Sequence, residues 1–143
     1  MPNWCYNSAE ISHPDPAKID ELIAVAKAGT MFEHFIPLPD GKWDRAWCVD
    51  NWGTKWEMSN PSVLERIDPN CLNLNFDTAW SPPIGVFEAM KQAGYYVRCE
   101  FSEDGAWFAG CWDNGEDECY DISELPEHLE HLKPSDWNEE EAA

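Results

Sequence analysis

YYVRCEFSEDGAWFAGCWDNGEDECYDI, residues 95–122, is the stretch that decides the expected architecture. It contains the strand-like runs YYVRCEF and AWFAGCW, and two dipeptides, Asp104-Gly105 and Asn114-Gly115, interrupt it. Dipeptides of this kind supply the positive φ that tight hairpin turns need. The stretch therefore predicts a β-meander: two strands about the first dipeptide and a third after the second.

Upstream of the meander, start and stop signals predict two helices. Asp15 as N-cap and Pro16 at the first helical position begin one helix, which Gly29 ends. Ser81, followed by two prolines, begins and caps the other, which Gly94 ends. Between these signals apolar residues recur at helical spacing: Ile19, Leu22, Ile23 and Ala26 in the first helix, and Ile84, Phe87, Met90 and Ala93 in the second.

Three further strands are expected, at residues 3–12, 31–39 and 72–80. The run LNLNFDTAW at 72–80 alternates apolar and polar residues, as a strand with one solvated face does. The run MFEHFIPLP at 31–39 also alternates and ends at prolines, which is typical of an edge strand. Residues 40–70 are the least regular part of the chain, and Ser123 is expected to cap a last short helix around 124–132.

Strands and helices in this order predict an α+β protein with a mostly antiparallel sheet and helices on one of its faces. The expected topology is a ferredoxin-like split β-α-β sandwich with a C-terminal β-meander. We expect a single domain over residues 1–133, with an irregular Trp-rich insertion at about 40–70. Residues 134–143 are expected to form a flexible acidic tail.

The charge of the chain excludes several classes of partner. Nine Lys and Arg face 28 Asp and Glu, for a net charge of −19. Direct binding of nucleic acid needs cationic groups, and so does binding to an anionic membrane surface. No apolar stretch approaches the ~18–20 residues of a membrane span, and the N-terminus lacks a basic start and an apolar core. The sequence therefore predicts a cytoplasmic protein.

No pattern in the sequence gives positive support for catalysis, a cofactor or a metal. G-x-S-x-G, H-E-x-x-H and a Walker-type loop are missing, and so is C-x-x-C among the six cysteines. We therefore expect no catalytic residues, and reduced cysteines with structural roles. His128 and His131 lie three residues apart, which a metal site allows, but solvated helical histidines are far commoner.

Three segments together resemble a known family: MPNWCYN (1–7), NWGTKWE (51–57) and FDTAWSPP (76–83). They are similar to the YubB-like proteins of plasmids and prophages, which carry a ferredoxin-like domain. The resemblance implies an α+β ferredoxin-like fold and a phage or other mobile element in bacterial cytoplasm as the setting. The family brings no established activity, so the resemblance implies no catalytic residues.

The first candidate site is a small-molecule or nucleotide site in the tryptophan-rich segments, either for binding alone or as part of an enzyme. Lys55 is suited to a phosphate, a tryptophan to stacking, and the helix start at Ser81 to an anion. The alternative is structural: the tryptophans wedge an irregular loop onto the sheet, Lys55 stays solvated and Ser81 caps the helix. The candidate residues are Asn51, Trp52, Gly53, Thr54, Lys55, Trp56, Trp80 and Ser81.

The second candidate site is an acidic surface near the C-terminus. Residues 100–143 hold 15 acids and one base, Lys133. Such a surface can imitate nucleic acid and dock on a basic host protein such as a nuclease, polymerase or defence effector, and thereby inhibit it. The alternatives are a solvated surface that keeps the protein soluble and a structural accessory of a phage particle. The candidate residues are Asp113, Glu116, Asp117, Glu118, Asp121, Glu124, Glu127 and Glu130, with Trp112 and Tyr120 as anchors.

Overall fold

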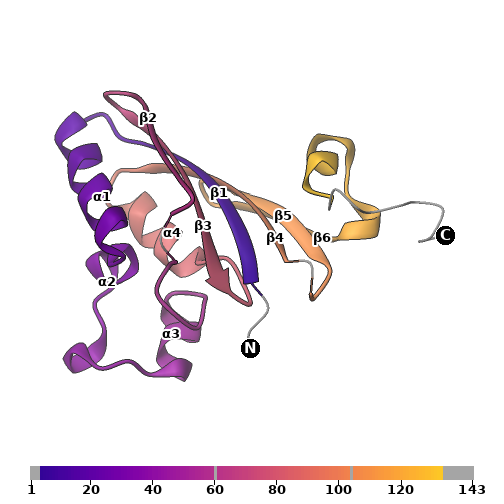
Figure 1. The fold of residues 1–143 in the computed structure, drawn as a ribbon, viewed down its shortest axis with the longest axis horizontal. Helices are drawn as coiled ribbons and strands as arrows, with labels where there is room; N and C mark the ends of the chain where they lie inside the picture. The colour runs from indigo at the N-terminus through magenta and orange to yellow at the C-terminus, as the bar shows by residue number, and fades with distance from the viewer. Residues whose placement is uncertain (1–3, 60, 104, 134–143) are drawn as a thin grey trace.

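The computed structural model describes residues 4–59, 61–103 and 105–133. Its centre is one antiparallel sheet of six strands in the order β2-β3-β1-β4-β5-β6 (Figure 1). This confirms the α+β class with a mostly antiparallel sheet. The strands are β1 (Trp4–Ser12), β2 (Val63–Asp68), β3 (Cys71–Ala79), β4 (Tyr96–Glu103), β5 (Phe108–Asp113) and β6 (Glu116–Asp121).

Helices cover one face of the sheet, and a short C-terminal segment lies against part of the other face (Figure 1). The α-helices are α1 (Pro16–Ala28), α2 (Met31–Phe35), α3 (Arg45–Asn51) and α4 (Ile84–Gln92). The 3-10 helices are η1 (Pro39–Gly41), η2 (Ile122–Glu124) and η3 (Glu127–Leu132). The main core lies between the helices and the sheet, and a smaller cluster lies between η3 and the opposite face of β5.

The first helix has the ends that its sequence predicts. The Asp15 carboxylate accepts a hydrogen bond from the Ala17 backbone N–H at 2.9 Å, and Gly29 ends α1 with φ of 72°. Ile19, Leu22 and Ala26 are the buried stripe of the helix. Local capping therefore sets both ends of this element.

The predicted strand at 31–39 is wrong, because residues 31–35 form the helix α2. Thr30 at its N-cap makes no side-chain hydrogen bond. The Glu57 carboxylate caps the helix instead: it accepts hydrogen bonds from the backbone N–H groups of Phe32 and Glu33, at 3.0 Å each. A residue 24 positions away therefore supplies the cap that this short helix lacks locally.

We expect Glu57→Ala to lower the free energy of unfolding by about 2 kcal/mol, since two helical N–H groups lose their acceptor. The change should also speed amide hydrogen exchange at Phe32 and Glu33. Urea unfolding and exchange measured by NMR test this expectation. Glu65→Ala is the matched control, because it removes an exposed carboxylate and is expected to change stability by less than about 0.5 kcal/mol. Equal stability of the two variants would contradict the capping role.

The irregular region at 40–70 contains two elements, α3 and β2, that were not predicted from its sequence. Asp44 caps α3 by accepting from the Trp47 backbone N–H at 3.0 Å. Strand β2 pairs with β3 at the edge of the sheet, and five of its six residues are exposed. Only Leu64 packs against the core, so the strand shows no clear alternation of apolar and polar residues, which is why the pattern missed it.

The turns of the meander follow the predicted signals in part. Asn114 and Gly115 have positive φ, as expected, and Trp107 in the first turn takes a φ of 63°. Asp104 and the acidic tail at 134–143 lie outside the described residues. The predicted helix around 124–132 is instead the pair η2 and η3, and Asp121 rather than Ser123 caps η2.

The six cysteines are free thiols, and all except Cys119 are buried. Burial raises the pKa of Cys5 to about 12. No helix among the described residues is long and apolar enough to cross a membrane.

Candidate functional site

The structure brings the two tryptophan-rich segments together. The Ser81 hydroxyl donates to the Gly53 carbonyl at 2.5 Å, and the Thr54 hydroxyl donates to the Ala79 carbonyl at 2.8 Å. Thr54 is fully buried. The contact between the segments is therefore made by side chains that bind the other segment's backbone.

The start of α4 is already occupied by this contact. Ser81 is not its N-cap: Pro83 holds that position, and the Gly85 backbone N–H donates to the Trp52 carbonyl at 3.1 Å. Trp52 itself is buried, and its indole N–H donates to the Ile36 carbonyl at 2.9 Å. These groups hold the loop to the helix, so the anion site expected at Ser81 loses an N–H group that would bind the anion.

Lys55 lies between two indole rings. Its Nζ is 4.5 Å from the ring centroid of Trp56 and 4.5 Å from that of Trp80, which is a double cation–π contact. Trp80 has a φ of 75°, a left-handed conformation that is costly for a bulky residue. The expectation that Lys55 is simply solvated is therefore wrong: the lysine is half-buried and held by its neighbours.

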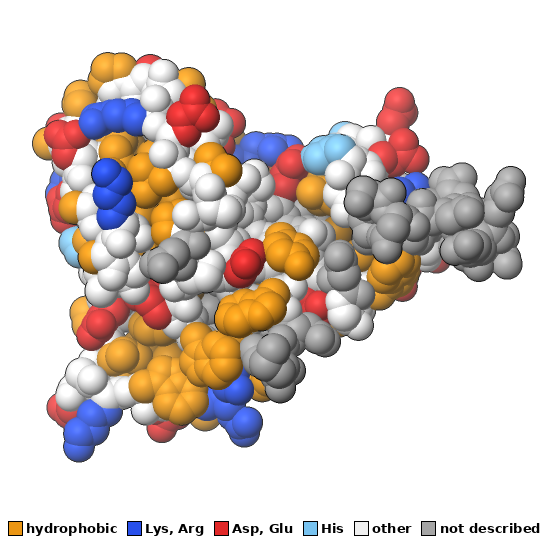
Figure 2. Space-filling model, in the orientation of Figure 1, with side chains coloured by type: hydrophobic (Ala, Val, Ile, Leu, Met, Phe, Trp, Pro, Cys, Tyr) orange, Lys and Arg blue, Asp and Glu red, His pale blue; other side chains and the backbone are white. Residues whose placement is uncertain are grey.

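An aromatic band crosses one end of the sheet, and we define it as Trp4, Tyr6, Trp43, Trp56 and Trp80. Figure 2 shows hydrophobic side chains running from the middle of the visible face toward its lower edge. Trp4 and Trp56 are 6.1 Å apart between ring centroids, and the Trp43 indole donates to the Lys55 carbonyl at 3.0 Å. The other four residues of the band, all except Trp56, are between 39% and 52% exposed. Exposed aromatic groups of this extent are typical of interaction surfaces.

The sequence indicated two of the five residues of this band. Trp56 and Trp80 belong to the predicted loop site, whereas Trp4 and Tyr6 lie in the expected strand at 3–12 and in the segment MPNWCYN. The missed signal is their spacing of two residues, which places both rings on one face of β1.

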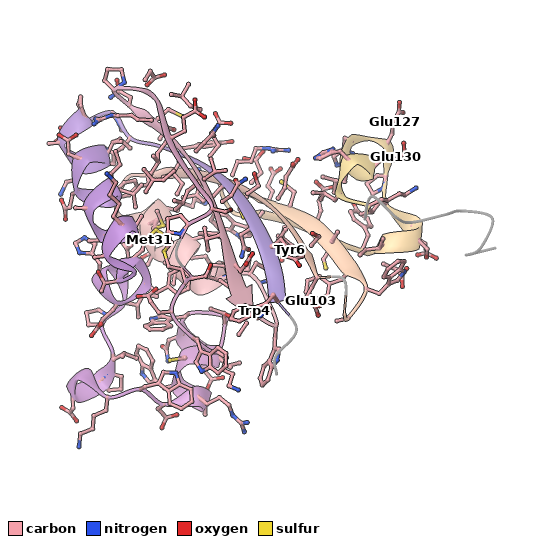
Figure 3. The ribbon with its side chains drawn as sticks, viewed as in Figure 1. Trp4, Tyr6, Met31, Glu103, Glu127 and Glu130 are labelled. Atoms are coloured by element: carbon pink, nitrogen blue, oxygen red, sulfur yellow. The ribbon has the colours of Figure 1, made fainter. Side chains whose placement is uncertain are left out.

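The acidic residues gather around the edge strand β6 and the segment after it. Along β6 alternate side chains point to opposite faces of the sheet, so Glu116 and Glu118 lie on one face and Asp117 and Asp121 on the other. Glu127 and Glu130 extend from η3 at the same end of the molecule (Figure 3). The acids thus surround one end of the protein rather than forming a flat patch.

Some of these acids have local partners. Asp113 accepts from the Tyr96 hydroxyl at 2.5 Å, and Glu118 accepts from the Tyr120 hydroxyl at 2.9 Å. The hydrogen bond from Tyr120, and then the one with His128, lowers the pKa of Glu118. Likewise, hydrogen bonds from Ser123 lower the pKa of Asp121. Glu118 and Asp121 therefore stay ionised to lower pH than an ordinary carboxylate does, which preserves the negative field.

Trp112 is not a surface anchor, which corrects the sequence-based expectation. Only 1% of it is exposed, and its ring centroid lies 5.7 Å from that of Phe87 on α4. Tyr120 is half-buried beside the small cluster under η3. Among the described residues, the exposed aromatic side chains are Tyr96 and four members of the aromatic band: Trp4, Tyr6, Trp43 and Trp80.

The histidines of η3 contact carboxylates of the sheet. His128 Nε2 lies 3.0 Å from Glu118 Oε1, and His131 Nε2 lies 2.6 Å from Glu100 Oε1. Within the described ranges, no three His, Cys, Asp or Glu side chains are placed to hold a metal ion. These contacts hold η3 against the sheet.

A hollow of about 600 Å³ opens where four loops meet, at the ends of β1 and β4. Asn70 at its wall donates to the carbonyls of His13 and Pro14, at 2.9 Å each. Tyr96 donates to Asp113. The polar side chains around the hollow thus hold the loops together.

The comparisons with known proteins show the fold alone. No family model matches the chain, and no curated protein matches its sequence. A solved structure that it resembles is the crystal structure of protein api92 from Yersinia pseudotuberculosis, of family DUF1281, with a TM-score of 0.55 and 10% identity. The match covers 88% of this chain and all of that one. At this identity, the likeness is one of architecture.

Proposed function

We propose that this chain is a non-catalytic binding protein whose acidic end occupies a basic surface of a host protein, as a nucleic acid would. The observation that carries the proposal is the placement of the acids at one end. Residues 105–133 hold eight acids and a single Lys or Arg, and seven of the eight lie on β6, η2 and η3. A field of this kind steers a cationic partner and disfavours anionic ones.

The biological setting and the finer topology belong to the same proposal. We infer a ferredoxin-like plan for the first four strands, supported by the order β2-β3-β1-β4 with α1 after β1 and α4 between β3 and β4. The likeness of three segments to the YubB-like family supports a phage or mobile-element protein of the bacterial cytoplasm. Inhibition of a host defence protein is the role that fits both an acidic surface and such a setting.

The test compares two triple variants of equal charge in an affinity capture from bacterial lysate. One is Asp117→Asn/Glu124→Gln/Glu127→Gln at the acidic end. The matched control removes three exposed acids elsewhere: Asp40→Asn/Asp50→Asn/Glu65→Gln. We expect the first to lose about tenfold or more of a basic protein captured at low salt, and the control less than about twofold.

Two outcomes would reject the proposal. Equal loss in both variants would mean that net charge, and not the acidic end, attracts the partner. Capture that does not fall between low and high salt would rule out an electrostatic interface.

A further inference from the structure

A groove runs along the face of the sheet opposite the α-helices, beside the aromatic band, and Leu132 of η3 lines one side of it. It consists of two adjoining hollows of about 210 Å³ and about 250 Å³. Both are lined by Ser8, Asn75 and Glu100, so they form one continuous furrow over β1, β3 and β4. Tyr6 lines one end, and Figure 3 shows it next to Trp4.

The groove follows from the strand register. Ser8 on β1 lies opposite Asn75 on β3 and Glu100 on β4, so all three point to the face of the sheet opposite the α-helices. Ser8 is small and sits between the larger Tyr6 and Glu10 along the strand, which leaves the floor low. The groove is thus part of a regular sheet and needs no loop movement to open.

Two carboxylates line the Tyr6 end, and they differ in their partners. Glu100 is held by His131 at 2.6 Å and by Arg98 at 3.3 Å. Asp77, directly opposite Tyr6 in the register, has no hydrogen-bond or ion-pair partner for its carboxylate within the described parts of the chain. Partial burial raises the pKa of Asp77, as expected when no cation offsets the loss of water.

We propose that this groove binds an arginine side chain of the basic partner, with the guanidinium stacked on Tyr6 and paired with the Asp77 carboxylate. The inference rests on the proposed function and names the residue class that anchors it. Arginine fits better than lysine because its planar guanidinium both stacks on a ring and forms two parallel hydrogen bonds to a carboxylate. Ser8 and Asn75 offer oxygen acceptors for its remaining N–H groups. The other residues of the aromatic band then cover apolar neighbours of that arginine in the partner.

The test is an NMR titration of the full chain with Nα-acetyl-arginine amide at low salt. Nα-acetyl-citrulline amide, its uncharged isostere, and Nα-acetyl-lysine amide are the comparison probes. We expect amide shifts confined to Tyr6, Ser8, Asp77 and their neighbours, with a dissociation constant on the order of 1 mM. Asp77→Asn and Tyr6→Ala should each weaken arginine binding, the first by about fivefold or more. Glu116→Gln, which removes a charge on β6, should leave it within about twofold.

The inference is overturned by equal binding of citrulline, by unchanged affinity in Asp77→Asn, or by shifts spread over every acidic residue. Lysine binding as tight as arginine would also contradict the stacked geometry. The two proposals fail separately. If the groove does not bind arginine while the β6 and η3 variants still lose their partner, this inference is wrong and the proposed function stands. If arginine binds but no salt-sensitive partner is captured, the proposed function is wrong.

Discussion

Trp112→Ala is expected to lower the free energy of unfolding by about 3–5 kcal/mol, as for other fully buried aromatic side chains. The ring is 1% exposed and packs against Phe87, so its removal leaves a cavity between β5 and α4. Under conditions in which the variant is folded, it should bind the partner as tightly as the unmodified protein does, because Trp112 does not reach the surface. Urea unfolding followed by circular dichroism measures the stability, and capture at low temperature measures the binding.

Tyr6→Ala is the control for Trp112→Ala. Tyr6 is also aromatic and lies on the sheet, but 52% of it is exposed. Its removal should change stability by less than about 1 kcal/mol. If Trp112→Ala were as stable as Tyr6→Ala, the burial of Trp112 would be wrong, and the side chain would again be a candidate anchor.

Gly85→Ala is expected to cost about 3 kcal/mol, at the upper end of what one added methyl group causes in a packed interior. A Cβ at Gly85 would lie 2.0 Å from the Asn51 carbonyl oxygen, and backbone cannot yield as a flexible side chain does. The start of α4 must therefore move away from the end of α3. The hydrogen bond from the Gly85 N–H to the Trp52 carbonyl should break as well.

Two measurements distinguish this local separation from a general loss of stability. The Gly85 amide should exchange faster than amides in the middle of α4. Tryptophan fluorescence should shift, since the Lys55 contact with Trp80 depends on the same loop. Glu88→Ala, on the exposed side of α4, is the control and should alter neither. An unchanged Gly85 amide in Gly85→Ala would contradict the close approach.

The parts of the fold that were predictable are those that local chemistry decides. Helix α1 carries its own cap at Asp15 and its own stop at Gly29, so the sequence itself marks both ends of the 13-residue helix between them. Helix α2 has no such cap, and the distant Glu57 carboxylate stabilises it. No pattern within residues 31–39 contains that information.

The candidate sites show the same division. The sequence indicated that the segments around Gly53 and Ser81 belong together, and they do make direct hydrogen bonds. It misplaced Trp112, because strand β5 is buried on both faces: α4 covers one and η3 the other. Exposure of a strand residue depends on what later segments cover, which alternation along one strand does not reveal.

The distribution of the thiols gives the protein a native labelling position. Five cysteines are buried and, with raised pKa values, resist alkylation, while Cys119 is exposed on the acidic strand β6. Cys119 is exposed as a residue, but partial desolvation of its thiol and the neighbouring Asp117 raise its pKa too, so mildly alkaline conditions suit the reaction. An iodoacetamide dye, which alkylates thiolates under such conditions, should therefore attach once per chain without any substitution. Its fluorescence would report directly whether a partner covers that end of the sheet.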